Sequence, residues 1–147
     1  MSNSRAVRFE TTLLVRDTCL CLHAQRAARA LARRFDEALR PVGLTNGQFS
    51  LMMSLNRPKP ATMGSVALLL AMDRTTLTAA LKPLERRGLV EVRPHPNDRR
   101  SRLITLTPDG LSLLARAVPI WESTHHAVEA STGGEGDRLR EHLRALS

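Results

Sequence analysis

The chain carries the sequence DRTTLTAALK at residues 73–82, and this segment has the pattern of a helix with one apolar edge. Leu77, Leu81 and Leu84 follow one another at intervals of four and three residues, so they lie on one side of a helix. Asp73 is suited to cap the first turn, because its carboxylate can accept from free backbone N–H groups. Pro83 should kink or loosen the last turn. The segment therefore predicts a capped helix that buries its leucines.

The other faces of this helix carry hydroxyl groups and positive charges. Short hydroxyl side chains let a helix backbone approach a base edge closely, and Arg or Lys reaches guanine or phosphate. The side chains that project away from the leucines are Arg74, Thr75, Thr78 and Lys82, with Thr76 near the boundary. An ordinary solvated helix could carry the same residues, so the flanking segments have to distinguish the two interpretations.

The segments on either side favour DNA binding. Residues 62–70 predict a short apolar helix, and Ala71-Met72 forms a link as tight as that of a helix-turn-helix. Gly88 can end the second helix in the left-handed conformation. Residues 89–93 and 103–106 then predict two strands.

The connection between these strands is basic. Residues 94–98 hold two prolines and an Asn-Asp pair, so we expect a loop there. The cations that follow it are Arg99, Arg100 and Arg102. A helix, a tight link, a second helix and a basic hairpin predict a winged helix-turn-helix, in a fold that is mainly α with a small β-hairpin wing.

In the order of these motifs the chain resembles the MarR-type transcriptional regulators. The matching sequences are DRTTLT at 73–78, LERRGLV at 84–90 and NDRRSRLITLTPDG at 97–110, within a close resemblance that covers residues 44–110. The resemblance implies a homodimer that binds double-stranded DNA at a palindromic operator, usually as a repressor. It implies release of the DNA on meeting a small organic effector or an oxidant. It also implies a ligand pocket between the dimerisation helices and the DNA-binding lobe.

The resemblance assigns the recognition helix to a major groove and the wing to an adjacent minor groove. Half-sites should then lie about one helical turn apart, ~10 bp. We expect Asp98 to orient Arg100 through a charge-assisted bond. The residues expected to contact DNA are Arg74, Thr75, Thr76, Thr78, Lys82, Arg99, Arg100 and Arg102.

The segments outside the lobe predict long helices that pair across a two-fold axis. Residues 9–40 repeat apolar side chains without Gly or Pro, so one continuous helix is expected there. We expect a single domain over residues 1–147, with the DNA-binding lobe at 45–107 and dimerisation helices at 9–40 and 108–147. The leucines that space the terminal helix are Leu139, Leu143 and Leu146.

Composition agrees with a DNA-binding protein and argues against an enzyme. The 147-residue chain has a net charge of +8 and a pI of about 11.3, which suits a polyanionic partner. It shows no glycine-rich phosphate loop, no nucleophile elbow and no His-Glu-x-x-His motif. With no membrane-length apolar run and no visible signal peptide, we expect a cytoplasmic protein without a membrane contact. We expect no cofactor and no metal ion.

Cys19 and Cys21 are the only cysteines. Two residues apart on a continuous helix, their thiols would point about 200° apart and could not easily pair with each other. One of them could pair with a cysteine of a partner subunit, and both could equally be small buried hydrophobes.

The resemblance adds a redox interpretation of these cysteines. Some MarR-type regulators sense organic peroxides with a cysteine in the first helix, and Cys21 falls at that place. The tyrosines that support this thiol are absent, because the chain contains no Tyr. We therefore favour a small-molecule effector. The alternatives are an oxidant sensor that uses Cys19 or Cys21, and an architectural DNA-binding protein without an effector.

Overall fold

The computed structural model of the chain describes residues 6–147. The chain divides into two compact units, one that ends at Arg34 and one that runs from Phe35 to Ser147. Helix α2 crosses the boundary, and each unit is described by itself below. None of the described helices combines the length and the apolar character needed to cross a lipid bilayer.

Two helices occupy the segment where one was predicted, α1 in the first unit and α2, which continues into the second. Helix α1 spans Phe9–Thr18 and α2 spans Leu20–Leu39, with Cys19 in an extended conformation between them (φ −67°, ψ 109°). The expectation of one helix over residues 9–40 was therefore wrong. The Thr18 hydroxyl donates to the Leu14 carbonyl at 2.7 Å, a side-chain bond that competes with helical geometry. The Cys19 sulfur then accepts from the Leu22 backbone N–H at 3.4 Å and caps the start of α2.

The second unit begins with the end of α2 and a sharp change of direction. A short 3-10 helix, η1 (Arg40–Val42), leads to Gly43 at φ 69°, a conformation that favours glycine. Helix α3 (Asn46–Leu55) starts at a capping box, in which Thr45 and Gln48 exchange hydrogen bonds of 3.1 Å. The Asp36 carboxylate accepts from the Asn46 backbone at 2.7 Å and fixes the same corner.

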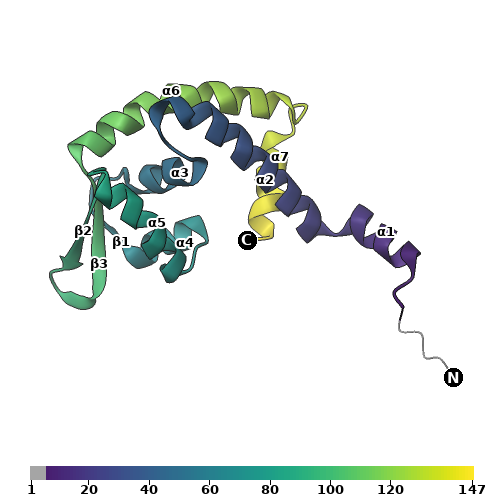
Figure 1. Ribbon diagram of the computed structural model, residues 1–147, viewed down its shortest axis with the longest axis horizontal. Helices are drawn as coiled ribbons and strands as arrows, with labels where there is room; N and C mark the ends of the chain where they lie inside the picture. Colours follow the sequence, from purple (N-terminus) through teal and green to yellow (C-terminus); the bar gives the residue numbers. More distant parts are fainter. Residues whose placement is uncertain (1–5) are drawn as a thin grey trace. The chain divides into compact units, whose positions relative to one another are not determined.

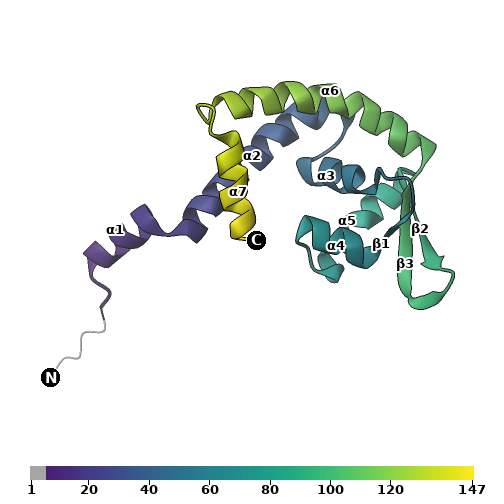
Figure 2. The same cartoon turned by 180° about the vertical axis from the view of Figure 1, so that it is seen from behind.

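The predicted helix-turn-helix is confirmed. Helix α4 spans Met63–Leu70, and its cap Thr62 accepts from the Ser65 backbone N–H at 3.1 Å. Ala71 takes the left-handed conformation (φ 52°, ψ 42°), which turns the chain into α5 (Arg74–Arg86) within three residues. The two helices lie side by side in both ribbon views (Figures 1 and 2).

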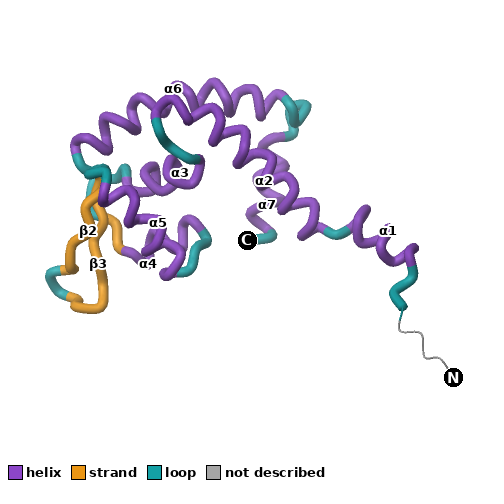
Figure 3. Tube along the Cα trace, in the orientation of Figure 1, coloured by secondary structure: helices purple, strands orange, loops and turns teal. Residues whose placement is uncertain are grey.

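The wing is a longer hairpin than the sequence predicted. Strands β1 (Ala61–Thr62), β2 (Val90–His95) and β3 (Asp98–Leu106) form an antiparallel sheet in the order β1-β3-β2. Figure 3 shows the β2–β3 hairpin extending beyond the helices. Pro94 was expected in a loop but lies in β2 opposite Arg102, next to a register shift. Proline is tolerated in an edge strand such as β2, because every second N–H of such a strand points away from the sheet.

Helix α6 follows the sheet directly. It spans Pro108–Ala130 and is capped by Thr107, whose hydroxyl oxygen accepts from the Gly110 backbone N–H at 3.0 Å. Gly110 packs so closely on the Leu89 carbonyl that a Cβ would not fit there. Helix α7 (Gly136–Ala145) ends the chain after the turn at Gly133 and Gly134.

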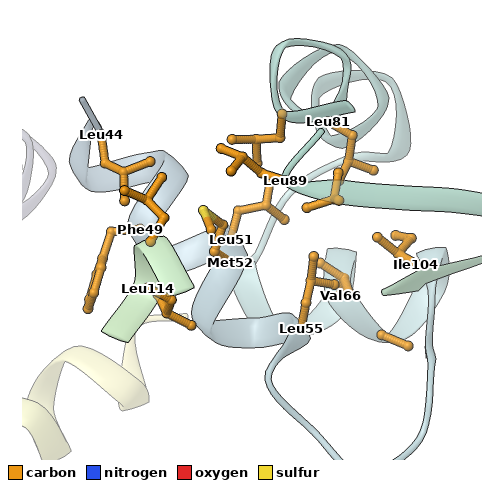
Figure 4. Packing of buried hydrophobic residues seen from close by; sticks show 14 of the residues in the cluster. Leu44, Phe49, Leu51, Met52, Leu55, Val66, Leu81, Leu89, Ile104 and Leu114 are labelled. Atoms are coloured by element: carbon orange, nitrogen blue, oxygen red, sulfur yellow. The ribbon is translucent and has the colours of Figure 1, made fainter. Parts of the chain in front are cut away.

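One core joins these elements. Leu77, Leu81 and Leu84 are at most 1% exposed, which confirms the predicted apolar edge of α5. They belong to one cluster with side chains from α3, α4, the sheet and α6, of which Figure 4 labels Met52, Val66, Ile104 and Leu114. The position of α5 is therefore set by side chains from every other element of the lobe.

Replacing Leu81 with Ala should lower the free energy of unfolding by about 2–5 kcal/mol, because the deletion leaves a cavity in a closed core. Urea unfolding followed by circular dichroism measures this loss. Leu68→Ala is the matched control, because Leu68 is 84% exposed and the same truncation there should cost less than about 0.5 kcal/mol. Equal losses in the two variants would contradict the placement of the core.

Candidate nucleic-acid interface

The outer face of α5 is polar and exposed. Arg74, Thr75, Thr78 and Lys82 are all exposed, while Leu77 and Leu81 of the same helix are buried. Residues at intervals of three and four share a face, so the four polar side chains form one surface. The structure thus brings together the residues of this helix that the sequence singled out.

The start of α5 is held by Asp73. Its carboxylate accepts from the Thr76 backbone N–H at 2.7 Å and from the Thr76 hydroxyl at 2.9 Å. The bond from the Thr76 backbone is the larger cause, and together the two bonds hold the pKa of Asp73 below its ordinary value. Thr76 therefore helps to cap the helix, and its hydroxyl proton is engaged within the protein.

The remaining hydroxyls of this face differ in their availability. Thr78 donates to the Arg74 carbonyl at 2.7 Å, so its oxygen is left to accept from a partner. No hydrogen bond among residues 6–147 engages the Thr75 side chain, which leaves its hydroxyl free to donate and to accept. Arg74 is placed beside α4, because a Cβ built at Gly64 would lie 3.4 Å from its Nη2 atom.

The wing carries its arginines along β3. Arg99, Arg100 and Arg102 are all exposed, and strand alternation puts Arg100 and Arg102 on one face and Arg99 on the other. The turn before them is tightened by the Asn97 backbone N–H, which donates to His95 Nδ1 at 3.1 Å. The hairpin therefore presents cations on both of its faces.

Asp98 bonds to Arg100, as expected, but through the backbone of Arg100 and not through its guanidinium. The Asp98 carboxylate accepts from the backbone N–H of Arg100 at 2.9 Å, and no ion pair among the described residues joins it to a guanidinium. Asp98 directly follows the turn, where a short carboxylate reaches the backbone two residues ahead. The Arg100 guanidinium is left available to another molecule.

The cations of both elements lack acidic partners. Within residues 6–147, no carboxylate lies within 4.0 Å of the charged groups of the five basic candidates. These are Arg74, Lys82, Arg99, Arg100 and Arg102. Unpaired cations on a helix and on a neighbouring hairpin form a surface that attracts a polyanion such as DNA.

A pocket in the second unit was implied by the resemblance, but its residues were not identified from the sequence. It has a volume of about 570 Å³ and lies between α3, α4 and α6. Trp121 stacks on Phe49 at a centroid distance of 6.1 Å and on His125 at 4.6 Å. The lining residues are Phe49, Ser50, Met53, Ser54, Leu69, Leu70, Val118, Trp121 and Glu122. The only signal in the sequence was helical spacing, which an ordinary core shares.

The two cysteines lie in the first unit and differ in exposure. Cys19 is half-buried at the break between α1 and α2, whereas Cys21 is exposed on α2. The Cys21 sulfur accepts from the Gln25 side chain at 3.2 Å. In the part of the chain that the structure describes, no three His, Cys, Asp or Glu side chains form a group suited to a metal ion.

Comparisons with known proteins support this arrangement. The sequence model of the MarR family matches residues 44–101. The transcriptional activatory protein BadR of Rhodopseudomonas palustris is 36% identical over 88 residues, which are 58% of this chain but only 50% of that protein. The organic hydroperoxide resistance transcriptional regulator of Bacillus subtilis is 30% identical over 113 residues, 77% of this chain and 76% of its own.

A solved structure extends the similarity to nearly the whole chain. The transcriptional regulator MosR of M. tuberculosis, crystallised in complex with DNA, is 40% identical and has a TM-score of 0.81. The alignment covers 88% of this chain and 93% of that one. The second unit is therefore built like a protein that has been seen on DNA.

Arg100→Ala should weaken DNA binding by about 1–3 kcal/mol if the guanidinium enters a groove. If Arg100 touches phosphate only, the loss should be the same on every DNA sequence. Fluorescence anisotropy at physiological salt measures both cases. Arg116→Ala is the control, because Arg116 is an exposed arginine of α6 outside the helix-turn-helix and the wing. An Arg100→Ala isotherm that matches the parent would rule out both roles.

Proposed function

Since this chain belongs to the MarR family of DNA-binding transcriptional regulators, we propose that it is a homodimeric repressor released from a palindromic operator by a small organic effector. In this proposal α5 enters the major groove and the β2–β3 wing reaches the adjacent minor groove. The contacts are made by Arg74, Thr75, Thr76, Thr78, Lys82, Arg99, Arg100 and Arg102.

The unpaired cations of α5 and of the wing carry the proposal. A helix with small hydroxyls beside Arg and Lys suits base edges in the major groove. Arginines on a narrow hairpin suit a minor groove, where A·T tracts concentrate negative potential. Thr76 acts in this scheme through the cap of α5, because its hydroxyl is bound to Asp73. Its oxygen can still accept from a phosphate-bound water or a base.

Exposed apolar residues support a dimer. Leu139 and Leu143 of α7 and Leu146 at its C-terminal cap are between 47% and 64% exposed, at intervals of four and three residues. A regular apolar stripe of this kind is typical of a helix that packs against another chain. We assign the dimer contact to α7 together with the helices of the first unit. Two recognition helices would then bind half-sites about one turn apart, ~10 bp.

The pocket between α3, α4 and α6 supports control by an effector. Its walls are mostly apolar, and its volume of about 570 Å³ suits a small organic molecule. Helix α4 packs on the recognition helix, whereas α6 continues from the wing. A ligand that binds better when these helices are apart shifts the population away from the DNA-binding arrangement.

Footprinting on the chain's own promoter region tests the proposal. We expect protection of two inverted half-sites, and transcription from that promoter should fall when the protein is added. Protection without regard to sequence would identify an architectural DNA-binding protein. If the footprint is sequence-specific but the added protein raises transcription, the operator in the proposal stands and the repressor role is contradicted.

Thiol-based sensing is a second candidate, favoured by the placement of Cys21. Its side chain is exposed, so an oxidant can reach the sulfur, which accepts a hydrogen bond from the Gln25 side chain at 3.2 Å. A thiolate can attack an organic hydroperoxide to give a sulfenic acid and an alkoxide, which takes up a proton. Arg16 is the nearest cationic residue before Cys21 in the sequence, but it pairs with Asp17 at 2.7 Å. This pairing argues against a sensing role for Cys21.

Treating the DNA-bound protein with one equivalent of an organic hydroperoxide decides between the two modes. We expect unchanged anisotropy, and unchanged binding for Cys21→Ser and for the matched control Cys19→Ser. Loss of DNA binding that dithiothreitol restores, and that Cys21→Ser abolishes, would replace the small-molecule mode by the oxidant mode.

A further inference from the structure

The pocket between α3, α4 and α6 has an aromatic wall. Phe49 of α3 and Trp121 of α6 both line it, and their rings are stacked with only 17° between the planes. Leu70 of α4 and Val118 of α6 add aliphatic surface. A flat, apolar ring of a ligand would be removed from water along these walls, which favours binding.

The charge in this pocket is negative. Glu122 is the only ionisable residue of the lining, although the chain has 22 Lys and Arg residues against 14 Asp and Glu. None of the ion pairs formed within residues 6–147 involves Glu122, so its carboxylate is not neutralised by the protein. The lining therefore offers an anion to a ligand and no cation.

We propose that the pocket binds a small aromatic amine in its protonated form. The ring packs between Phe49, Leu70 and Val118, and the ammonium group donates to the Glu122 carboxylate. This inference rests on the proposed function, since it names the class of effector that the pocket would take.

The same geometry works against an aromatic acid. The carboxylate of such a ligand would face Glu122 with no arginine or lysine in the lining to balance it. Two like charges at close distance disfavour binding, so the pocket discriminates by repulsion as well as by attraction. Glu122 is thus the residue that determines specificity.

Trp121 provides a direct readout of the pocket. It is the only tryptophan of the chain, so a fluorescence change reports on this site alone. We would titrate the full-length protein, without DNA, with three ligands of one shape. These are para-tert-butylbenzylamine, para-tert-butylbenzyl alcohol and para-tert-butylbenzoate, which carry a positive charge, no charge and a negative charge.

We expect the amine to bind more tightly than the alcohol, and the alcohol more tightly than the benzoate. Glu122→Gln should weaken the amine by about three- to tenfold, the range for a partly exposed charge-assisted contact, and should leave the alcohol unchanged. Glu85→Gln is the matched control, because Glu85 is exposed on α5 and does not line the pocket. It should leave all three affinities unchanged.

Three results would overturn the inference. The first is a benzoate that binds as tightly as the amine, and the second is a preference for the amine that survives in Glu122→Gln. The third is the absence of saturable binding of all three ligands, by fluorescence and by calorimetry. The proposed function is tested separately by adding the amine to the DNA complex. An amine that binds the pocket but leaves the DNA bound would contradict release by an effector while confirming the ligand class.

Discussion

Burial of three leucines sets the orientation of the recognition helix. Leu77, Leu81 and Leu84 are removed from water in a core shared by α3, α4, the sheet and α6, so α5 cannot rotate about its axis without exposing them. Fixing the buried edge also fixes the opposite one. The exposed positions of Thr75, Thr78 and Lys82 are thus a consequence of hydrophobic packing rather than of any contact that these side chains make themselves.

A single threonine connects the wing, the end of α5 and the start of α6. The Thr107 hydroxyl donates to the Gly88 carbonyl at 2.6 Å and accepts from the Gly110 backbone N–H at 3.0 Å. Gly110 allows α6 to approach Leu89 closely, where a side chain would not fit. This junction makes α6 a direct continuation of the DNA-binding lobe. A shift of α6 relative to α3 and α4 would therefore have to be accommodated at the base of the wing.

Local signals in the sequence predicted much of the second unit. Asp73 has a side chain suited to a helix start and Gly88 a conformation suited to a helix end, so the limits of α5 could be read directly. The break at Cys19 could not, because the apolar pattern continues through it and no Gly or Pro marks it. Arg100 was correctly expected as the partner of Asp98, but its backbone N–H makes the bond, because a short carboxylate just after a turn reaches the backbone two residues ahead. The pocket residues come from three helices that only tertiary packing brings together.

Pro94 affects whether the wings of neighbouring molecules on DNA can pair through their edge strands. A hairpin that projects from a lobe offers the outer side of its edge strand as a template on which a strand of another molecule could pair. Strand β2 has that position, yet Pro94 lacks the N–H that such pairing needs, and the register shift beside it distorts the remaining edge. The opposite edge, β1, is only two residues long. The edges by which neighbouring wings on DNA could join into a shared sheet are therefore interrupted by a proline on one side and very short on the other.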